Sequence, residues 1–157
     1  MNFSTRSIAL RQTGASLVAL AGAVLVSACA APLAGKSGAV PLATDLSCML
    51  PSNCVSSLSA SGPEPLRFEG SPEQAMVDLK ATLAGFPEAK IVGVDAFALS
   101  AIFTTPVGFQ DTVQFIIDAP RQRIDYRSQS RFGLYDFGKN RSRMAAFAER
   151  FEQTRGR

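Results

Sequence analysis

The sequence predicts an α+β fold, a two-layer sandwich in which a small antiparallel sheet carries two helices on one face. Two amphipathic helical segments stand on either side of three alternating strand segments. The turns between these strands are short, and strands joined in this way pair antiparallel. Each helical segment has one apolar stripe, so both helices are expected to cover the same face and to leave the other face free.

The first helix is expected to begin at Pro72, with Ser71 as its cap and Gln74 completing a capping box. Gly85 and Pro87 end it. Its apolar stripe recurs at helical spacing and consists of Met76, Leu79, Leu83 and Phe86.

Before and after this helix lie the expected strands. A short strand is predicted at Pro65–Phe68. Lys90–Thr105 is strand-like, with Gly93 or Asp95 marking a bend or turn. Gln110–Asp118 and Arg121–Arg131 alternate between apolar and polar residues. The expected core side of the sheet is formed by Phe97, Leu99, Ala101, Phe103, Val113, Phe115, Ile117, Ile124 and Tyr126.

The second helix is expected from about Asn140, a suitable cap, to Thr154. Its buried stripe is Met144, Phe147 and Phe151. The loop before it carries three aromatic residues, Phe132, Tyr135 and Phe137. These side chains could enter a lipid interface, but we expect them to pack over an edge of the sheet, as such residues more often do.

The N-terminus has the pattern of a bacterial lipoprotein signal. Arg6 and Arg11 precede an apolar stretch of about a dozen residues, and the small residues 26–28 precede Cys29. This order predicts that residues 1–28 are removed and that the Cys29 sulfur is acylated. A transmembrane anchor is the alternative, but the strongly apolar part is shorter than the ~20 residues that a spanning helix needs.

The expected anchor implies a location. Ala30, not Asp, follows Cys29, which argues against retention at an inner membrane. We therefore expect attachment to the outer membrane, on its periplasmic face. Residues 29–46 are rich in Ala, Gly, Pro and Ser and are expected to form a flexible tether. Residues 47–157 are expected to form a single α+β domain.

The cysteine and histidine content limits the chemistry. Cys48 and Cys54 are the remaining cysteines, and in an oxidising compartment such a pair predicts a disulfide. A metal site built on them would need two further ligands. The chain has no histidine, which removes the commonest general base and every His-dependent triad. We expect neither a metal nor a cofactor.

Charge is unevenly distributed along the chain. The formal net charge is +3, and it falls to +1 once Arg6 and Arg11 leave with the signal. Residues 29–118 carry four basic and nine acidic side chains, whereas residues 119–157 carry ten basic and four acidic ones. The total gives no reason to expect a nucleic-acid partner. The asymmetry indicates a basic face, which either meets an acidic partner or pairs with the acidic half of the chain.

The densest polar cluster lies in the last strand. Arg127 and Arg131 share one strand face, about 13 Å apart. With the neighbouring hydroxyls of Ser128 and Ser130 they could bind a carboxylate or phosphate. The alternative is a solvated face crossed by salt bridges of little energetic value.

Four segments, taken in order along the chain, resemble the family called domain of unknown function 1499. They are residues 51–57, 108–111, 126–133 and 136–143. Members are often bacterial lipoproteins or small exported proteins, and the resemblance implies no established activity, substrate or cofactor. This chain has Gln110-Asp111 where members commonly have an acidic pair, which weakens any role needing two carboxylates there.

The resemblance groups the polar motif residues into one candidate anion-binding site. Its members are Asn53, Ser56, Asp111, Arg127, Ser128, Ser130, Arg131, Asp136, Asn140 and Arg141. Arg127, Arg131 and Arg141 would grip the anion, and the two aspartates would orient them.

We expect a membrane-anchored, non-enzymatic binding or envelope-maintenance module that recognises an anionic group, either a small molecule or a lipid. One alternative is a hydrolase or transferase acting on an envelope polymer or lipid, with Asp111 or Asp136 as the acid or base. The other is a structural module that docks on an envelope protein.

Overall fold

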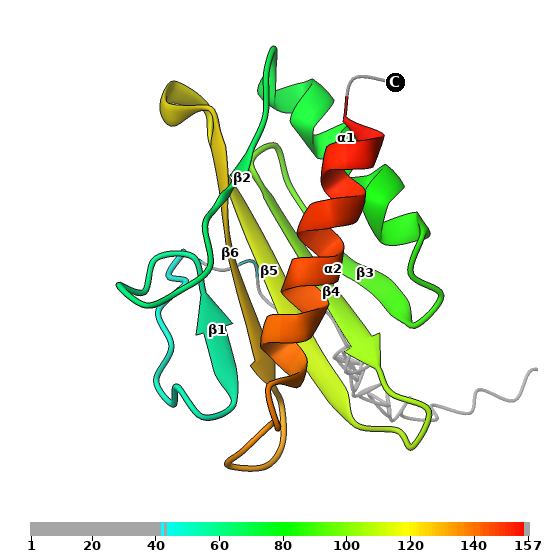
Figure 1. Ribbon diagram of the computed structural model, residues 1–157. Helices are drawn as coiled ribbons and strands as arrows, with labels where there is room; N and C mark the ends of the chain where they lie inside the picture. Colours follow the sequence, from blue (N-terminus) through cyan, green and yellow to red (C-terminus); the bar gives the residue numbers. More distant parts are fainter. Residues whose placement is uncertain (1–41, 43, 156–157) are drawn as a thin grey trace, which may run out of the picture. The chain divides into compact units, whose positions relative to one another are not determined.

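The computed structural model describes residues 42 and 44–155. They form one antiparallel sheet with the strand order β1-β6-β5-β4-β3, and β2 also pairs with β6 (Figure 1). The expected signal, Cys29 and most of the expected tether lie outside the described residues. In chain order, the elements are β1 (Cys54–Ser56), β2 (Leu66–Arg67), α1 (Pro72–Ala84), β3 (Ala89–Val94), β4 (Ala98–Thr104), β5 (Gln110–Asp118), a 3₁₀ turn (Ala119–Arg121), β6 (Arg123–Ser130) and α2 (Lys139–Thr154).

The predicted α+β class is confirmed, and both helices cover the same face of the sheet. Their stripes meet alternate residues of the strands in one core, which is built mainly on Leu79, Leu83, Phe103, Phe115, Tyr126, Met144, Phe147 and Phe151. The ring centroids of Phe115 and Phe147 lie 4.9 Å apart, so β5 and α2 meet at the centre of this core. None of the helices in the described part of the chain has the length and hydrophobicity of a membrane-spanning segment.

Helix α1 begins as its sequence predicts. The Ser71 side chain accepts a hydrogen bond from the Gln74 amide at 3.2 Å, and Pro72 occupies the first turn. The second half of the expected capping box, a hydrogen bond from the Ser71 amide to the Gln74 side-chain oxygen, does not form; the Gln74 side-chain nitrogen donates to Asp78. Gly85 ends the helix and donates its N–H to carbonyls of the last turn.

Lys90–Thr105 is divided into β3 and β4 by a turn at Asp95. The Asp95 carboxylate accepts hydrogen bonds from the amides of Phe97 and Ala98, while Gly93 lies next to an irregularity in the β3–β4 register. The prediction that Phe97 faces the core is wrong. It lies in the turn before β4, which begins only at Ala98, and is 48% exposed.

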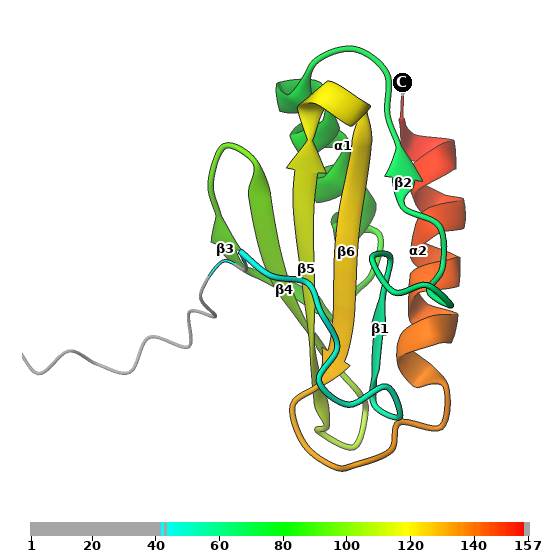
Figure 2. The same cartoon turned by 90° about the vertical axis from the view of Figure 1, so that its left-hand side faces the viewer.

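The face opposite the helices is not free, contrary to the prediction. The segment that leads into β1 runs across it, as the pale blue-green trace before β1 shows in Figure 2. Leu46, the last residue of the expected tether, is 1% exposed there.

A second correction concerns Asn140, which is not the cap of α2. Gly138 holds that position, in the left-handed conformation with φ 76°, and Asn140 is a buried residue of the first turn.

Candidate functional site

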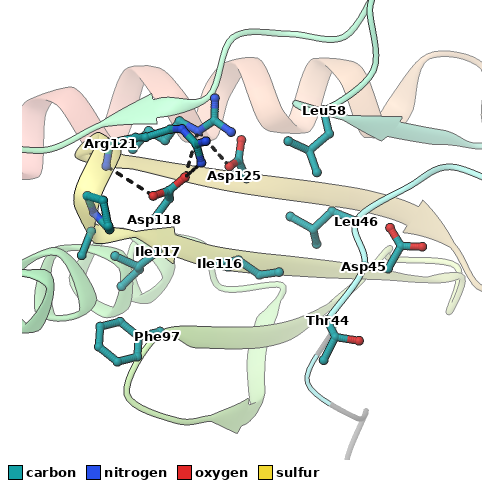
Figure 3. A pocket seen from close by; sticks show the side chains of 13 residues that line it. Thr44, Asp45, Leu46, Leu58, Phe97, Ile116, Ile117, Asp118, Arg121 and Asp125 are labelled. Atoms are coloured by element: carbon teal, nitrogen blue, oxygen red, sulfur yellow. Dashed lines mark hydrogen bonds and ion pairs between the residues drawn. The ribbon is translucent and has the colours of Figure 1, made fainter.

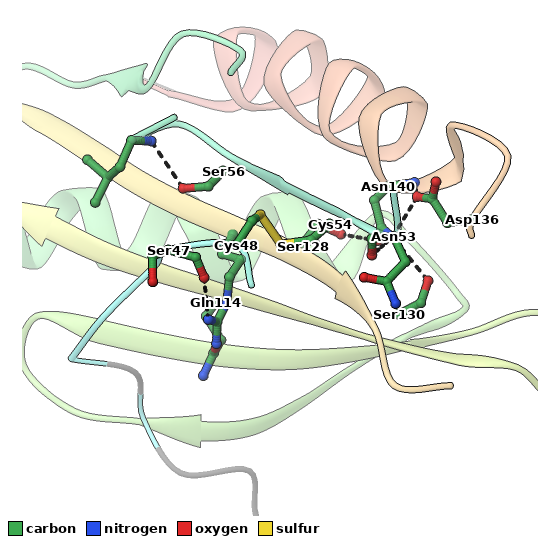
Figure 4. The surroundings of a disulfide bond; sticks show 12 residues. Ser47, Cys48, Asn53, Cys54, Ser56, Gln114, Ser128, Ser130, Asp136 and Asn140 are labelled. Carbon is green, nitrogen blue, oxygen red and sulfur yellow. Dashed lines mark hydrogen bonds between the residues drawn. A yellow bond between two sulfur atoms is a disulfide. The ribbon is translucent and has the colours of Figure 1, made fainter. Parts of the chain in front are cut away.

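Asn140 is the hub of a buried hydrogen-bond network beneath the first turn of α2. Its side chain is 1% exposed. The Oδ1 atom accepts from Ser128 Oγ at 2.6 Å and from Arg143 Nη1 at 2.9 Å. The Nδ2 atom lies 3.1 Å from the Asn53 carbonyl, 3.1 Å from Ser130 Oγ and 2.7 Å from an Asp136 oxygen. Figure 4 shows these groups converging from β6, the start of β1 and the loop before α2.

Asp111 and Arg143 extend the Asn140 network to β5. Arg143 Nη2 lies 2.5 Å from Asp111 Oδ2, and the side chains are 10% and 7% exposed. The guanidinium carbon also lies 5.0 Å from the centroid of the Phe103 ring. With its charge paired to Arg143 in a largely buried position, Asp111 is a structural ion-pair partner.

Arg143 is a member of the network that the sequence analysis missed. A usable signal was its position, three residues after Asn140 and four before Phe147, on the buried side of a predicted helix. A charged residue on such a stripe needs a buried partner. The carboxylate of Asp111 meets this requirement.

Asp136 is held in the same region by the start of α2. Its carboxylate accepts from the Gly138 amide at 2.9 Å and from the Asn140 amide at 2.8 Å, besides the Asn140 side chain. It therefore satisfies N–H groups at a helix N-terminus that has no side-chain cap at Gly138. Its negative charge also suits the positive end of the helix dipole.

The remaining predicted site residues do not join this network. Arg127 lies on the face opposite the helices, where it donates to the Ser47 carbonyl at 2.8 Å and to Gln114 at 2.5 Å. Arg131 donates to the Gln110 side chain at 2.7 Å. Arg141 lies on α2 and contacts the Ser61 carbonyl at 3.3 Å. The structure thus gives the three arginines expected to grip one anion separate partners. Ser56 accepts from the Leu58 amide.

The predicted disulfide is present. Cys48 and Cys54 are joined by an S–S bond, with their Cα atoms 5.7 Å apart. It connects the segment that crosses the sheet face opposite the helices to the first residue of β1, and Figure 4 shows it next to the Asn140 network. The disulfide therefore restrains the stretch that contains Asn53.

The loop between β6 and α2, residues 132–138, carries large apolar side chains that face solvent. Phe132, Leu134, Tyr135 and Phe137 are 81%, 79%, 62% and 89% exposed. The expectation that the aromatic residues pack over an edge of the sheet is therefore wrong. We call residues 132–138 the aromatic loop.

Hydrogen bonds to the chain before β1 hold the aromatic loop. Ser52 Oγ donates to the Leu134 carbonyl at 2.5 Å, and Asn53 Nδ2 donates to the Gly133 carbonyl at 2.6 Å. The Asp136 amide donates to the Ser52 carbonyl at 3.1 Å. These bonds use backbone groups of the loop, which leaves its side chains directed away from the sheet.

A pocket of about 560 Å³ lies on the face opposite the helices. Its polar side contains Asp118, Arg121 and Asp125, and its apolar side contains Leu46 and Ile116 (Figure 3). The hydrogen bond from Arg121 holds the pKa of Asp118 below its usual value. Asp125 lies 3.0 Å from Arg123. Arginines therefore compensate Asp118 and Asp125, while the third carboxylate of the lining, Asp45, accepts hydrogen bonds from Ser47.

Residues 46–151 match a family described as "Protein of unknown function (DUF1499)". The chain belongs to this family. The matched span runs from Leu46 to Phe151, which are 1% and 0% exposed, so the DUF1499 region coincides with the folded domain. It contains the Asn140 network, the disulfide and the aromatic loop. No curated protein and no solved structure matches the chain.

The described residues offer few groups for metal chemistry. Among residues 42 and 44–155, no three His, Cys, Asp or Glu side chains are placed to hold a metal ion together. The polar motif segments of this DUF1499 chain instead contact one another, and their common effect is to position the aromatic loop and the first turn of α2.

Proposed function

We propose that this protein is a lipid-anchored, non-enzymatic module of the bacterial envelope that binds an anionic group. The observation that carries the proposal is the engagement of both candidate acid–base residues. Asp111 is paired with Arg143, and Asp136 accepts three hydrogen bonds at the start of α2. A general acid or base needs a proton-transfer route to a substrate, whereas the observed partners of both carboxylates are groups that hold the fold together. A binding role therefore fits this domain better than a hydrolase or transferase role.

The cations near the two ends of the aromatic loop support the proposal that the ligand is anionic. Arg131 precedes the loop, and Lys139 and Arg141 follow it; all three are exposed. Asp136 is the single acidic residue between Arg131 and Arg141, and its carboxylate accepts three hydrogen bonds at the start of α2. We therefore place the anion-binding surface at these three cations, in place of the grouping with Arg127 that the sequence suggested.

The lipid anchor is supported by the signal pattern that ends at Cys29. Its test is a comparison of the wild-type protein with Cys29→Ala, expressed with the native signal. We expect the wild-type chain in the outer-membrane fraction, with a mass that shows cleavage before Cys29 and added acyl chains. The variant should keep its signal or leave the membrane. A wild-type chain without acyl chains would rule out the anchor.

Anion binding is tested separately, by native mass spectrometry of the full mature chain purified gently from membranes. We expect a retained anionic molecule, which is lost when Arg131, Lys139 and Arg141 are all replaced by Gln. Arg155→Gln, at the distal end of α2, is the matched control and should retain it. Equal retention by both variants would count against this surface.

A further inference from the structure

We infer that the anionic group is the headgroup layer of a bilayer, and that the aromatic loop and the neighbouring β4–β5 turn insert into it. This inference rests on the proposed function and names its partner. The inserting side chains, which we call the apolar tip, are Val107, Phe109, Phe132, Leu134, Tyr135 and Phe137.

The first argument is the concentration of apolar side chains. The two members of the apolar tip in the β4–β5 turn, Val107 and Phe109, are 78% and 57% exposed, and those of the aromatic loop are exposed to a similar or greater degree. The two loops are neighbours, because the Arg131 amide donates to the Gln110 carbonyl at 3.0 Å. Figures 1 and 2 show both loops at the same end of the sheet. Single exposed apolar residues are ordinary, whereas a group at one end of a domain indicates an interaction surface.

The second argument is that the apolar tip is held outward by the fold. Hydrogen bonds from Ser52 and Asn53 fix the backbone of the aromatic loop, and the Asn140 network fixes its end. Phe137 has φ 55°, a left-handed conformation that is unfavourable for a bulky residue. Its ring nevertheless packs only at the surface, edge-on to Tyr135 with centroids 5.0 Å apart. A binding surface ordered in advance loses less conformational entropy when it binds.

The third argument is the composition of this end, which favours a bilayer over a protein. Phe and Leu side chains suit the acyl region, and Tyr suits the interface. Arg131 and Lys139 stand at the two ends of the aromatic loop, where cations meet anionic headgroups. Aromatic residues and arginine are common in protein interfaces too, but lysine is depleted there, so Lys139 is the residue that favours a bilayer.

The fourth argument is reach. Twelve residues, 30–41, separate Cys29 from the described domain. Fully extended, they would span at most about 40 Å. A domain tethered at Cys29 therefore remains near the membrane that holds its lipid, and the apolar tip can contact the same surface.

The absence of tryptophan from the chain allows a direct test. Phe137→Trp places a single fluorophore in the apolar tip of the full mature chain. Phe97→Trp is the matched control, since Phe97 is also exposed but lies in the β3–β4 turn at the opposite end of the strands. Each protein is added to vesicles of phosphatidylcholine, alone or mixed with phosphatidylglycerol, with or without lipids brominated on the acyl chains.

We expect the emission of Phe137→Trp to shift to the blue and to be quenched by brominated lipid, most strongly in the anionic vesicles. Phe97→Trp should show neither effect. Adding Arg131→Gln or Lys139→Gln to Phe137→Trp should weaken its response to anionic vesicles by about fivefold per residue. Phe132→Trp provides a second probe should Phe137→Trp fold poorly.

The possible failures can be told apart. Vesicle flotation shows whether the lipid anchor attaches the chain to vesicles, whereas quenching shows whether the apolar tip reaches the acyl chains. A chain that floats with vesicles while Phe137→Trp remains unquenched would overturn this inference and leave the anchor intact; a protein would then be the occupant to seek. If Cys29 carries no acyl chain, quenching of the added protein still decides the question, since the apolar tip is present in either form.

Discussion

Arg143 on α2 and Asp111 at the start of β5, thirty-two residues apart, form a buried ion pair with an N–O distance of 2.5 Å. The pair joins the helix layer to the sheet at the end that carries the aromatic loop. Its arginine also donates to Asn140, so the ion pair and the Asn140 network form one unit. Four segments of this DUF1499 chain meet there: the start of β1, the start of β5, the end of β6 and the start of α2.

Breaking this ion pair should be costly. Arg143→Met leaves the Asp111 carboxylate buried without its partner, and we expect a loss of about 3–5 kcal/mol in the free energy of unfolding. The double variant Asp111→Leu with Arg143→Met should lose less unfolding free energy than the sum of the losses in the two single variants. Urea denaturation of the four proteins gives the coupling energy. Additive losses would show that the two side chains do not stabilise each other.

Asn140→Asp should destabilise the domain without changing the size of the side chain. The new oxygen cannot donate to the Asn53 carbonyl, and it stands beside the Asp136 carboxylate. We expect a loss of at least about 3 kcal/mol at neutral pH, because buried acceptors lose their donor and two like charges are brought together. Glu149→Gln, on the exposed side of α2, should stay within about 0.5 kcal/mol of wild type. Similar denaturation midpoints for both variants would contradict the role of Asn140 as the hub.

Because of Tyr126, the free energy of unfolding should fall as pH rises through the alkaline range. Burial raises the pKa of its phenol to about 12, whereas the unfolded chain has a value near 10. The unfolded state therefore loses this proton first as pH rises. The stability contributed by Tyr126 is complete below a pH of about 10 and is lost as pH approaches about 12, by up to about 3 kcal/mol.

The matched variant for this pH dependence is Tyr126→Phe. It removes the hydrogen bond to the Glu64 carbonyl, which should cost about 1 kcal/mol at neutral pH. Above a pH of about 10, its stability should fall less steeply than that of wild type. Parallel curves of unfolding free energy against pH would show that Tyr126 is not responsible.

The Cys48–Cys54 disulfide should contribute modestly. It closes a loop with a sequence separation of 6, for which loop entropy predicts about 2 kcal/mol. Cys48→Ser with Cys54→Ala should show that loss in urea denaturation, and reduction of the wild-type protein should reproduce it. A loss near zero would mean that the neighbouring hydrogen bonds hold this segment by themselves.

Arg127 should act on stability through the segment that crosses the sheet. Its guanidinium donates to the Ser47 carbonyl and to Gln114. We expect Arg127→Ala to lower the free energy of unfolding by about 1.5–3 kcal/mol, as for hydrogen bonds to a charged group. Arg131→Ala, at an exposed position, should change it by less than about 1 kcal/mol. A wild-type melting temperature for Arg127→Ala would show that these two hydrogen bonds do not stabilise the segment.

Much of the fold could be predicted because its signals are local. The strand alternation identified Val113, Phe115 and Ile117 as core residues, and helical spacing identified Met144, Phe147 and Phe151. All six are buried. Each helix or strand buries one of its own faces, so its apolar residues recur with a fixed period. That period can be read from the sequence without knowing which element packs against it.

Element ends were less predictable. Asn140 has the side chain of a helix cap, yet it lies inside the first turn, and Asp136 accepts the bonds from the N–H groups there. Both residue types can serve as caps in isolation. The choice depended on Asn53, Ser128 and Ser130, which offer Asn140 partners in the interior.

The sequence by itself determined the α+β class, the two helical stripes, the antiparallel pairing of the consecutive strands after α1 and the cysteine pair, because these follow from short-range periodicity and composition. Only the tertiary structure decided which polar residues meet. It paired Asp111 with Arg143, separated Arg127 from Arg141, and held the aromatic loop outward through Ser52 and Asn53. The physical reason is that a buried polar group must find its partner in three dimensions, and sequence spacing does not encode which distant segment supplies it.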